Sequence, residues 1–535
     1  MLDREGAEPH LRRRTTFDRG AWIAAASIVA LHAALLARFA VDWPLHDDFT
    51  QIVAIPGYLV QLPTLREKIA LFTHLALEHR AATIRVAGWI ASLAPGGMNF
   101  VALIALGNAL ALGAGIVAVV AYPRAYRGGA ALLAALLLTS GTHYAAQFHA
   151  TGALQHFGVA FYALASLFSL SRQRRILAAL FAVAAVFTSG SGLLVLPCAA
   201  VMTWLSGRTR EAVLWAVAAG VIMAVHFLGY EGPASRAGLA SLIEDPLRAL
   251  AFLLAALGCI GAALPASLVV GAGIVLAWFV WLVSGAWRRV PPFVIAAALF
   301  FALALGAIAA GRASLGIDAV LLSRYRIGSA LLVLLTAAAG ACVLDAMRFR
   351  WVERATIAGA AVLYGIAFSV VSTSLVDLHV MQRMLRDHFA ADDSGHYEGY
   401  QQAFGDFTLR RAREIGAYDG ARNADPPGAI VEAIASQGPR ARLLHASVFA
   451  GTRVFSVFGV VEGGHREAWV WLRGDDRMFR GSLKTLRYPG HRFGTQTAFH
   501  ATLATAGVPP GRYQVGFSDD GNAGIAWTGQ DVEVR

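Results

Sequence analysis

The sequence predicts an α-helical polytopic membrane protein, with about 10–12 transmembrane helices and a small C-terminal, sandwich-like, all-β soluble domain. Hydrophobic residues make up 57% of the 535 residues and charged residues only 15%, whereas a soluble domain usually has about 25% charged residues. Runs of about 20 apolar residues, long enough to cross a bilayer, recur in the first two thirds of the chain. Polar segments and short strands of alternating polarity follow them.

The N-terminal segment, residues 1–20, is polar and basic, and we expect it to be cytoplasmic. No small-residue cleavage site follows the first apolar run, so a retained signal anchor is expected there. The polytopic domain extends over residues 21–375 and includes a long first periplasmic loop, residues 41–97. Apolar runs of spanning length lie at residues 21–40, 98–121, 129–148, 153–171, 211–229, 248–264, 266–286, 292–310, 326–346 and 355–375.

Two shorter apolar halves occupy residues 176–206 and are joined by the sequence TSGSG at 188–192. Glycine and serine interrupt a helix readily. Irregular backbone at membrane depth requires surrounding protein or water. The segment therefore forms either a tight hairpin or a broken helix around a polar cavity.

The net charge of +11 comes almost entirely from arginine, since Lys68 and Lys484 are the only lysines. Arginines gather in short turns between the apolar runs, which is typical of cytoplasmic loops and headgroup contacts, and no nucleic-acid partner is predicted. The abundance of alanine, glycine and arginine suggests a GC-rich bacterial genome. We therefore expect a multi-pass protein of the bacterial inner membrane.

The arginine distribution places residues 311–325 and everything after about residue 376 outside the cytoplasm, so the C-terminal domain is predicted to be periplasmic or extracellular. One conflict remains, because three apolar runs separate the cytoplasmic signals at 206–210 and 287–289. An odd number of spans cannot return the chain to the same side. Either the run at 248–264 does not cross the membrane fully, or the arginines at 287–289 do not mark a cytoplasmic loop.

The chain after residue 375 divides into a helical connector, residues 376–437, and a β-domain, residues 438–535. The clearest helical stretch of the connector is GYQQAFGDFTLRRAREIGAY. Six alternating segments separated by Gly, Pro and Asp predict the strands of the β-domain, namely RLLHASVF, RVFSVFGVV, EAWVWLR, TAFHATLAT, RYQVGF and QDVEVR. The acidic sequences GDD and SDDGNAG are interpreted as turns, with calcium or sugar binding as the alternative.

The first outer loop opens with a cluster of acidic residues. His46, Asp47 and Asp48 follow directly after the first apolar run and Asp42. A carboxylate at the membrane–water boundary can deprotonate a hydroxyl, or hold a divalent cation such as Mg²⁺ or Mn²⁺ that neutralises phosphate. The alternative is a solvated turn that ends the helix.

Helical periodicity over residues 71–93 places His74, Glu78 and Arg85 on one face of an otherwise apolar helix. Such a polar stripe suits an anionic lipid headgroup. The alternative is the solvated face of an amphipathic helix that lies on the bilayer.

A second outer cluster contains Arg312, Arg324 and Arg326 together with Ser323 and Tyr325. Cations on this side oppose the positive-inside tendency, and arginine forks pair well with phosphate oxygens. We therefore predict phosphate binding, against the alternative of interfacial snorkelling.

A third set of polar residues lies between residues 142 and 157, namely His143, Tyr144, Gln147, His149 and His156. These side chains are interpreted as a polar and aromatic interface belt, with a cavity lining as the alternative. No spacing in this set predicts a dedicated metal site, and no metal-ligating residues are assigned.

The acidic residues after the first span, the EHR element of the first loop, the later GR…SRY element and the soluble C-terminal domain resemble the polytopic GT-C glycosyltransferases, in a poorly characterised bacterial branch. The resemblance in layout covers roughly residues 20–375. It implies a polyprenyl-phosphate-linked sugar donor and an envelope glycan, lipid or protein acceptor, with membrane lipids as further partners.

By this resemblance Asp47 or Asp48 would activate the acceptor. Arg80, Arg85, Arg312 and Arg324 would hold the donor phosphate, near His46, His74, Glu78, Tyr325 and Arg326. The chain lacks a sequence like the WWDYG signature of oligosaccharyltransferases, which argues against protein N-glycosylation.

Two other classes of function are compatible with the sequence. A transporter or flippase of lipid-linked or anionic substrates would carry polar groups near the middle of paired broken helices. Here the charges gather near one predicted face, and the middles of the apolar runs are almost free of charge. The remaining alternative is a non-catalytic envelope scaffold whose β-domain binds the partner.

Overall fold

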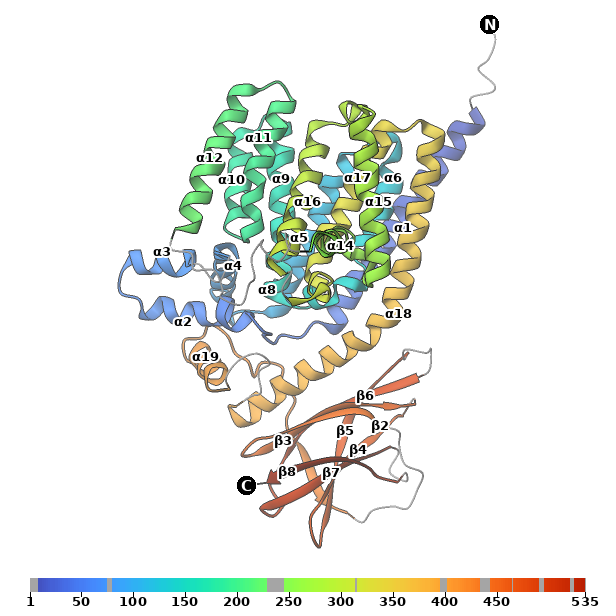
Figure 1. Cartoon of the computed structure of the whole chain (residues 1–535). Helices are drawn as coiled ribbons and strands as arrows, with labels where there is room; N and C mark the ends of the chain where they lie inside the picture. The colour runs from blue at the N-terminus through green and yellow to red at the C-terminus, as the bar shows by residue number, and fades with distance from the viewer. Residues whose placement is uncertain are drawn as a thin grey trace. The chain divides into compact units, whose positions relative to one another are not determined.

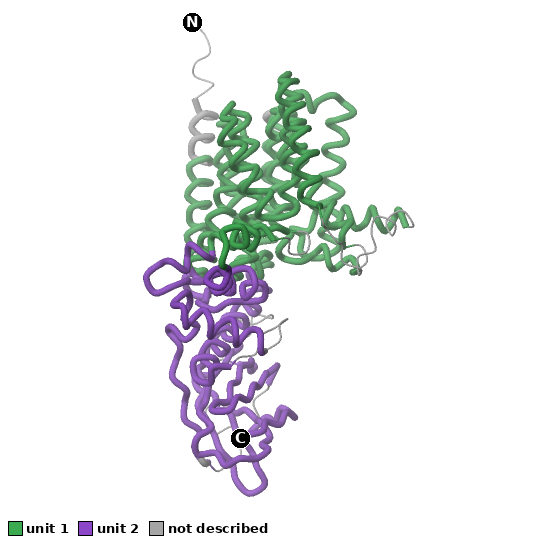
Figure 2. The backbone as a smooth tube through the Cα atoms, turned by 90° about the vertical axis from the view of Figure 1, so that its left-hand side faces the viewer, with its two compact units in different colours: residues 1–36, 63–87, 102–367 green, residues 37–62, 88–101, 368–535 purple. Residues whose placement is uncertain are grey.

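The protein folds into two compact units in the computed structural model (Figure 2). Unit 1 comprises residues 1–36, 63–87 and 102–367, and unit 2 comprises residues 37–62, 88–101 and 368–535. The structure describes residues 8–74, 79–228, 245–312, 315–394, 402–433, 443–463, 465–489, 495–519 and 524–534.

Eight helices in the described part of the chain are long and apolar enough to cross a membrane, which is compatible with a multi-pass membrane protein (Figure 1). A ninth span results if the bent pair Arg124–Leu138 and Gly141–Gln147, which contains α6 (Arg127–Leu138) and α7 (Tyr144–Gln147), is counted as one. The eight comprise α1 (Glu8–Phe39), α5 (Phe100–Val120), the continuous stretch from α8 (Ala150–Gly152) through η4 (Ala153–Phe157) to α9 (Gly158–Ser171), α12 (Thr209–Phe227), α15 (Leu264–Val283), α16 (Pro292–Arg312), α17 (Arg326–Val343) and α18 (Ala346–Asp392).

The TSGSG sequence forms a tight turn between two short apolar helices, α10 (Arg175–Val186) and α11 (Val195–Leu205). The 3-10 helix η5 (Gly190–Leu194) lies in this turn and brings Gly192 against the end of α10. A Cβ atom on Gly192 would lie 2.0 Å from the carbonyl oxygen of Ala185. Only glycine fits at this position of the turn. Of the two arrangements expected for residues 176–206, the structure has the tight hairpin.

Helix α14 (Pro246–Leu257) has 12 residues and is therefore about 18 Å long, shorter than the roughly 30 Å hydrocarbon core. Its length fits the alternative in which the run at 248–264 does not cross fully. Two glycines let α14 and α15 approach closely. A Cβ atom on Gly258 would lie 2.0 Å from the Ser267 carbonyl oxygen, and one on Gly271 would lie 2.0 Å from the Leu254 carbonyl oxygen.

The prediction of one helix over residues 71–93 is wrong. Helix α3 (Leu65–Thr73) ends at His74, whose backbone is extended, and α4 (Ala82–Ser92) begins eight residues later. The Arg85 guanidinium donates hydrogen bonds to carbonyl oxygens at the end of α3. Arg85 was expected on the same helix as His74, but it lies on α4 and caps the C-terminal end of α3. Glu78 lies outside the described residues.

Unit 2 contains the π-helix η1 (Phe49–Val53), α2 (Ala54–Gln61), the last part of α18, α19 (Gln402–Glu414) and an eight-stranded sheet. Helix α18 continues to Asp392 and so includes the beginning of the predicted connector. Helix α19 lies within the stretch GYQQAFGDFTLRRAREIGAY, which was predicted to be the clearest helix of that connector. In this unit Val376 and Val380 of α18 pack against Val460 and Ala498 of the sheet.

The β-domain is barrel-like and is not the expected sandwich of two packed sheets. Its strands form one sheet in the order β2-β3-β6-β1-β5-β4-β7-β8, and β2 also contacts β8. The strands are β1 (Gly428–Glu432), β2 (Leu443–Ala450), β3 (Val454–Glu462), β4 (Ala468–Arg473), β5 (Met478–Pro489), β6 (Thr495–Ala504), β7 (Gly511–Asp519) and β8 (Ala526–Val534).

The long strand β5 is the physical reason for this closure. Its first half pairs with β4, from Met478 to Leu483, and its second half pairs with β6, from Lys484 to Pro489. One strand therefore joins the two halves that a sandwich would keep apart. Phe455, Phe499 and Phe517 are buried in the interior that results.

The contact between α14 and α15 predicts a difference between two glycines of one helix. We expect Gly271→Ala to destabilise the protein by about 1–3 kcal/mol, because its methyl group would overlap the Leu254 carbonyl. Gly273→Ala is the matched control, since no atom lies within 4 Å of its Cβ position. Thermal unfolding of the two purified variants in detergent checks this expectation, and equal melting temperatures would contradict it.

Candidate functional site

The acidic pair predicted from the sequence lies in unit 2, in a turn that ends in the π-helix η1. Asp48 is only 1% exposed, and its Oδ2 accepts a hydrogen bond of 3.0 Å from the backbone N–H of Leu45. Asp47 and His46 are exposed, and His46 has a left-handed backbone with a φ of 41°. The two adjacent carboxylates therefore differ: Asp48 orders the turn, whereas Asp47 is accessible to a ligand.

A third carboxylate of the same loop, Asp42, is 8% exposed. Its Oδ1 accepts a hydrogen bond of 2.8 Å from the Phe100 N–H, and its Oδ2 has no hydrogen-bond partner in the described part of the chain. The Tyr418 hydroxyl donates to the Asp42 carbonyl oxygen at 3.0 Å. Burial raises the pKa of Asp42, against the smaller opposing effects of the Phe100 hydrogen bond and the charges of Arg422 and Arg386.

Aromatic packing fixes this loop within unit 2. The Trp43 and Phe389 rings lie 5.9 Å apart, and the Arg413 guanidinium lies 4.8 Å from the Phe389 ring. A Cβ atom on Gly420 would touch both Trp43 and Phe389 at 3.4 Å or less, so the backbone approaches these rings closely. The loop that holds the carboxylates is therefore well anchored.

The polar end of α18 holds the β-domain through carboxylates that the sequence analysis did not single out. Asp392 accepts hydrogen bonds from Thr452 N, Thr452 Oγ1 and Arg453 N at 3.0, 2.6 and 3.0 Å. Asp425 pairs with Arg383 at 2.7 Å and with Lys484 at 2.5 Å. Hydrogen bonding to Lys484 lowers the pKa of Asp425. The signal in the sequence was the charge-rich end of an otherwise apolar helix.

In unit 1, Arg312 and Arg324 come together around one aromatic ring. Their guanidinium carbons lie 5.9 and 5.2 Å from the centre of the Tyr325 ring, in geometry typical of cation–π contacts. Tyr325 meets the ring of His156 edge-on at 5.8 Å. The structure thus brings together three of the residues predicted for phosphate binding. They are the two arginines and the tyrosine ring on which both stack.

Histidines extend this group. His79 and His149, like both arginines, lie close enough to act electrostatically on the His156 ring. We call His79, His149, His156, Arg312 and Arg324 the basic cluster. Neither arginine makes an ion pair or a hydrogen bond to any residue that the structure describes, and the Arg324 Nε atom is buried. The two arginines of the basic cluster therefore offer hydrogen-bond donors that have no acceptor among the described residues.

Unlike Arg312 and Arg324, Arg326 uses its hydrogen-bond donors within the protein. Its Nε and Nη2 atoms donate to the Leu321 carbonyl oxygen at 3.0 and 2.7 Å, and its Nη1 atom donates to the Thr142 carbonyl oxygen at 2.6 Å. The side chain fixes the turn before α17 and connects it to the segment around α7. Its geometry is that of a residue that organises backbone.

Arg80 and Arg85 also donate to backbone. Arg80 contacts the carbonyl oxygens of Thr73 at 2.8 Å and His226 at 2.9 Å, and so links the ends of α3 and α12. Arg85 Nη1 lies within 3.1 Å of three carbonyl oxygens around the end of α3. His74 is exposed at the same end. Sequence alone could not separate these arginines from those of the basic cluster.

The polar set at residues 142–157 divides into two groups. His143 and Gln147 are buried in unit 1 and are not part of an exposed belt. The His143 Nε2 atom lies 2.8 Å from the Leu137 carbonyl oxygen, and Gln147 donates to the Leu138 carbonyl oxygen at 3.2 Å. By contrast, His149 and His156 belong to the basic cluster.

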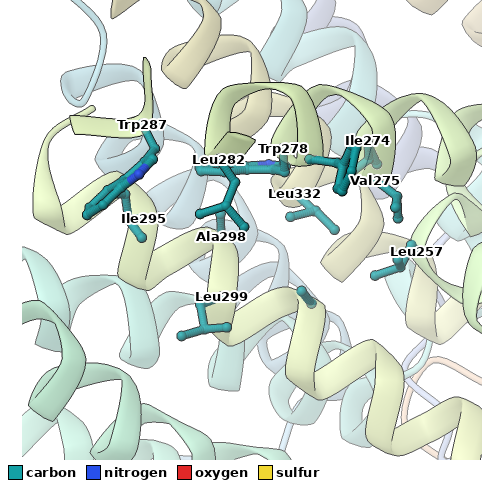
Figure 3. Close-up of a pocket in the computed structure, with 12 residues that line it drawn as sticks. Leu257, Ile274, Val275, Trp278, Leu282, Trp287, Ile295, Ala298, Leu299 and Leu332 are labelled. Atoms are coloured by element: carbon teal, nitrogen blue, oxygen red, sulfur yellow. The ribbon is translucent and has the colours of Figure 1, made fainter. Parts of the chain in front are cut away.

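An apolar groove of about 450 Å³ lies between α15 and α16 in unit 1 (Figure 3). Trp278 and Trp287 contribute large rings to its lining, and Ile295, Leu299 and Ala302 of α16 contribute aliphatic side chains. The lining is suited to a hydrocarbon chain. Among the described residues, no group of three or more His, Cys, Asp or Glu side chains could hold a metal ion.

Comparison of the chain with known protein families, with curated proteins and with solved structures finds no match. Function is therefore inferred from the chemistry of the residues themselves.

Asp42 predicts a pH-dependent stability difference. Because burial raises its pKa, the folded state favours the neutral carboxyl group, and ionisation at higher pH costs stability. We expect Asp42→Asn to match wild type at acidic pH and to become more stable than wild type as pH rises through the raised pKa, by about 1.4 kcal/mol for each pKa unit. Unfolding of both proteins between pH 4 and pH 8 measures the difference. Lower stability of the variant at pH 8 would show that the arginine charges outweigh burial.

Proposed function

We propose that this chain is a glycosyltransferase of the bacterial inner membrane, which moves a sugar from a polyprenyl-phosphate-linked donor to an envelope glycan, lipid or protein acceptor at the outer face. The observation that carries the proposal is the basic cluster, in which Arg312 and Arg324 have no hydrogen-bond acceptor within the described chain. The number of spans, about 10–12, and the periplasmic location of the β-domain belong to the same proposal.

Phosphate is the ligand chemistry that best complements this cluster. Guanidinium groups donate paired hydrogen bonds that match phosphate oxygens, and these charge-assisted bonds are roughly twice as strong as neutral ones. Tyr325 lies near both guanidinium groups and restricts their positions. The leaving phosphate gains negative charge when the glycosidic bond breaks, and preorganised arginines stabilise that charge without reorganisation.

The groove on α16 supports a donor that carries a hydrocarbon chain. Ala302 at the groove and Arg312 in the basic cluster lie ten residues apart on the same helix, which corresponds to about 15 Å. A lipid with its phosphate at Arg312 could therefore place its chain along α16. Such a donor needs no nucleotide-binding fold.

The carboxylates supply the base in this proposal. Asp47 or Asp48 takes the proton of the acceptor hydroxyl while its oxygen forms the new bond to the anomeric carbon, and the bond from that carbon to the phosphate oxygen breaks. The polyprenyl phosphate leaves with the bonding electrons. Asp47 has the accessibility that a base requires, and Asp48 orders the turn that presents it.

The basic cluster predicts a loss of donor binding. We expect Arg312→Gln with Arg324→Gln to weaken binding of a short-chain polyprenyl phosphate by at least about tenfold, because two charge-assisted contacts are lost. Arg172→Gln is the matched control, since Arg172 also stacks on a ring, that of Phe168 at 5.2 Å, but lies outside the cluster. Binding to protein in nanodiscs and sugar transfer are measured together. Unchanged binding and transfer would overturn the proposal, and binding without any transfer by wild type would favour a transporter.

The acidic pair predicts a loss of transfer without a loss of insertion. Asp47→Asn and Asp48→Asn remove no apolar helix and no positive-inside signal, so both variants should reach the membrane at normal levels. We expect at least one of them to abolish transfer. Complementation of a deletion strain, with Asp318→Asn as an exposed control in unit 1, tests this. Full activity of both variants would show that the pair only forms a turn.

A further inference from the structure

Helix α3 carries an apolar stripe that the described part of the chain leaves largely uncovered. None of its nine residues, all of which the structure describes, is buried. Leu65 and Ile69 are 74% and 54% exposed, and Phe72 is half-buried. These three side chains follow the spacing i, i+4 and i+7, so they lie on one face of the helix. A helix that packs on its own protein would bury such a stripe.

The charged residues of α3 are arranged around this stripe. With about 3.6 residues per turn, Arg66 and Lys68 flank the stripe on its two sides, and Glu67 lies on the opposite face. Thr64 N and Oγ1 donate to Glu67 Oε2 at 3.0 and 2.7 Å, so the one carboxylate of α3 is used in the helix cap. Neither cation makes an ion pair or a side-chain hydrogen bond with a residue that the structure describes. The exposed face therefore combines apolar side chains with two positive charges.

Hydrogen bonds fix the C-terminal end of α3 beside the end of α12. The Arg80 guanidinium donates to the Thr73 carbonyl oxygen at 2.8 Å and to the His226 carbonyl oxygen at 2.9 Å. Helix α12 is long and apolar enough to cross a membrane, and it ends at Phe227. Beyond this end, α3 runs crosswise to α12 (Figure 1). A span ends where the hydrocarbon core meets the headgroups, so α3 lies at that level.

The exposed surface of α12 leads to the same place. Val213, Val217, Val221 and Val225 are each 57% or 58% exposed and form a stripe along the helix. Leu228, directly after the last turn, is 72% exposed. Such a stripe on a spanning helix is suited to lipid tails. Because α3 is joined to the end of this lipid-facing helix, lipid is a better occupant of its apolar stripe than a protein partner.

We propose that α3 is a membrane-surface helix that binds a bilayer containing anionic phospholipid. Leu65, Ile69 and Phe72 enter the region between headgroups and acyl chains, as the apolar face of an interfacial amphipathic helix does. Arg66 and Lys68 stay at the level of the headgroups, where they contact lipid phosphate. The helix cap keeps the only carboxylate of α3 on the opposite face, away from the anionic surface. This surface is separate from the proposed transfer reaction and does not depend on it.

Spin labels on the full-length protein in nanodiscs test the position of α3. Leu65→Cys and Ile69→Cys each place a label on the apolar stripe. Ala70→Cys is the matched control, because Ala70 is exposed on the side of the helix away from the stripe. Cys198 and Cys259 are buried, and labelling of the unsubstituted protein gives the background from the native cysteines.

We expect the two labels on the stripe to collide with oxygen, which dissolves in lipid, and to lie about 5–10 Å below the phosphate groups. A neutral, water-soluble nickel chelate should collide with the control label and not with these two. Nickel collisions at all three labels would show a solvated face and overturn the proposal. Collision of the stripe labels with neither reagent would show that protein, such as a second copy of this chain, covers the stripe, and would also overturn it.

The two cations predict a dependence on lipid charge. We expect the nickel collision rate at Ile69→Cys to be at least about threefold lower in nanodiscs with phosphatidylglycerol than in pure phosphatidylcholine, because an anionic surface attracts each cation. Arg66→Gln with Lys68→Gln should remove this difference. Arg66→Lys with Lys68→Arg keeps both charges and should preserve it. Equal rates in both lipids without these changes, or a difference that survives the glutamine variant, would overturn the assignment of anionic lipid to these cations.

Discussion

Helix ends that lie within the protein need hydrogen-bond donors, and this requirement governs the arginines of unit 1. The last carbonyl groups of a helix have no partner within the helix itself. Arg80, Arg85 and Arg326 supply donors to such carbonyls and to turns beside them. The irregular connections between apolar helices would be costly without them. Arg312 and Arg324 donate to no such carbonyl group in the described part of the chain, which is why the proposed phosphate site is assigned to them.

The sequence predicted most apolar helices well, because about 20 consecutive apolar residues have few other stable arrangements. It failed where tertiary contacts decide the outcome. The pattern over residues 71–93 has helical periodicity, but Arg85 contributes more by closing the end of α3 than by extending a helix. Strands β1 and β5 were missed, since GAIVE is short and MFRGSLKTLRYP carries glycine, proline and several cations.

The candidate site could be predicted only in part for a related reason. Residue type and position pointed to Arg312, Arg324 and Tyr325, which lie together, and equally to Arg80, Arg85 and Arg326, whose donors contact backbone. In the acidic loop the adjacent pair drew attention away from Asp42. The hydrogen bonds to Asp42 come from Phe100 and Tyr418, which lie 58 and 376 residues away in the sequence. No local pattern encodes contacts between residues so distant in sequence.

The topology of the β-domain also constrains when it can fold. The hairpin of β4 and β5 is local and can form early, as can that of β7 and β8. The parallel pairing of β1 with β6, and the contact between β2 and β8, join segments more than 70 residues apart. Closure must therefore wait until β8 has been synthesised. Until then the edges of β2 and β7 remain open, and a nascent chain would be exposed to strand pairing with its neighbours.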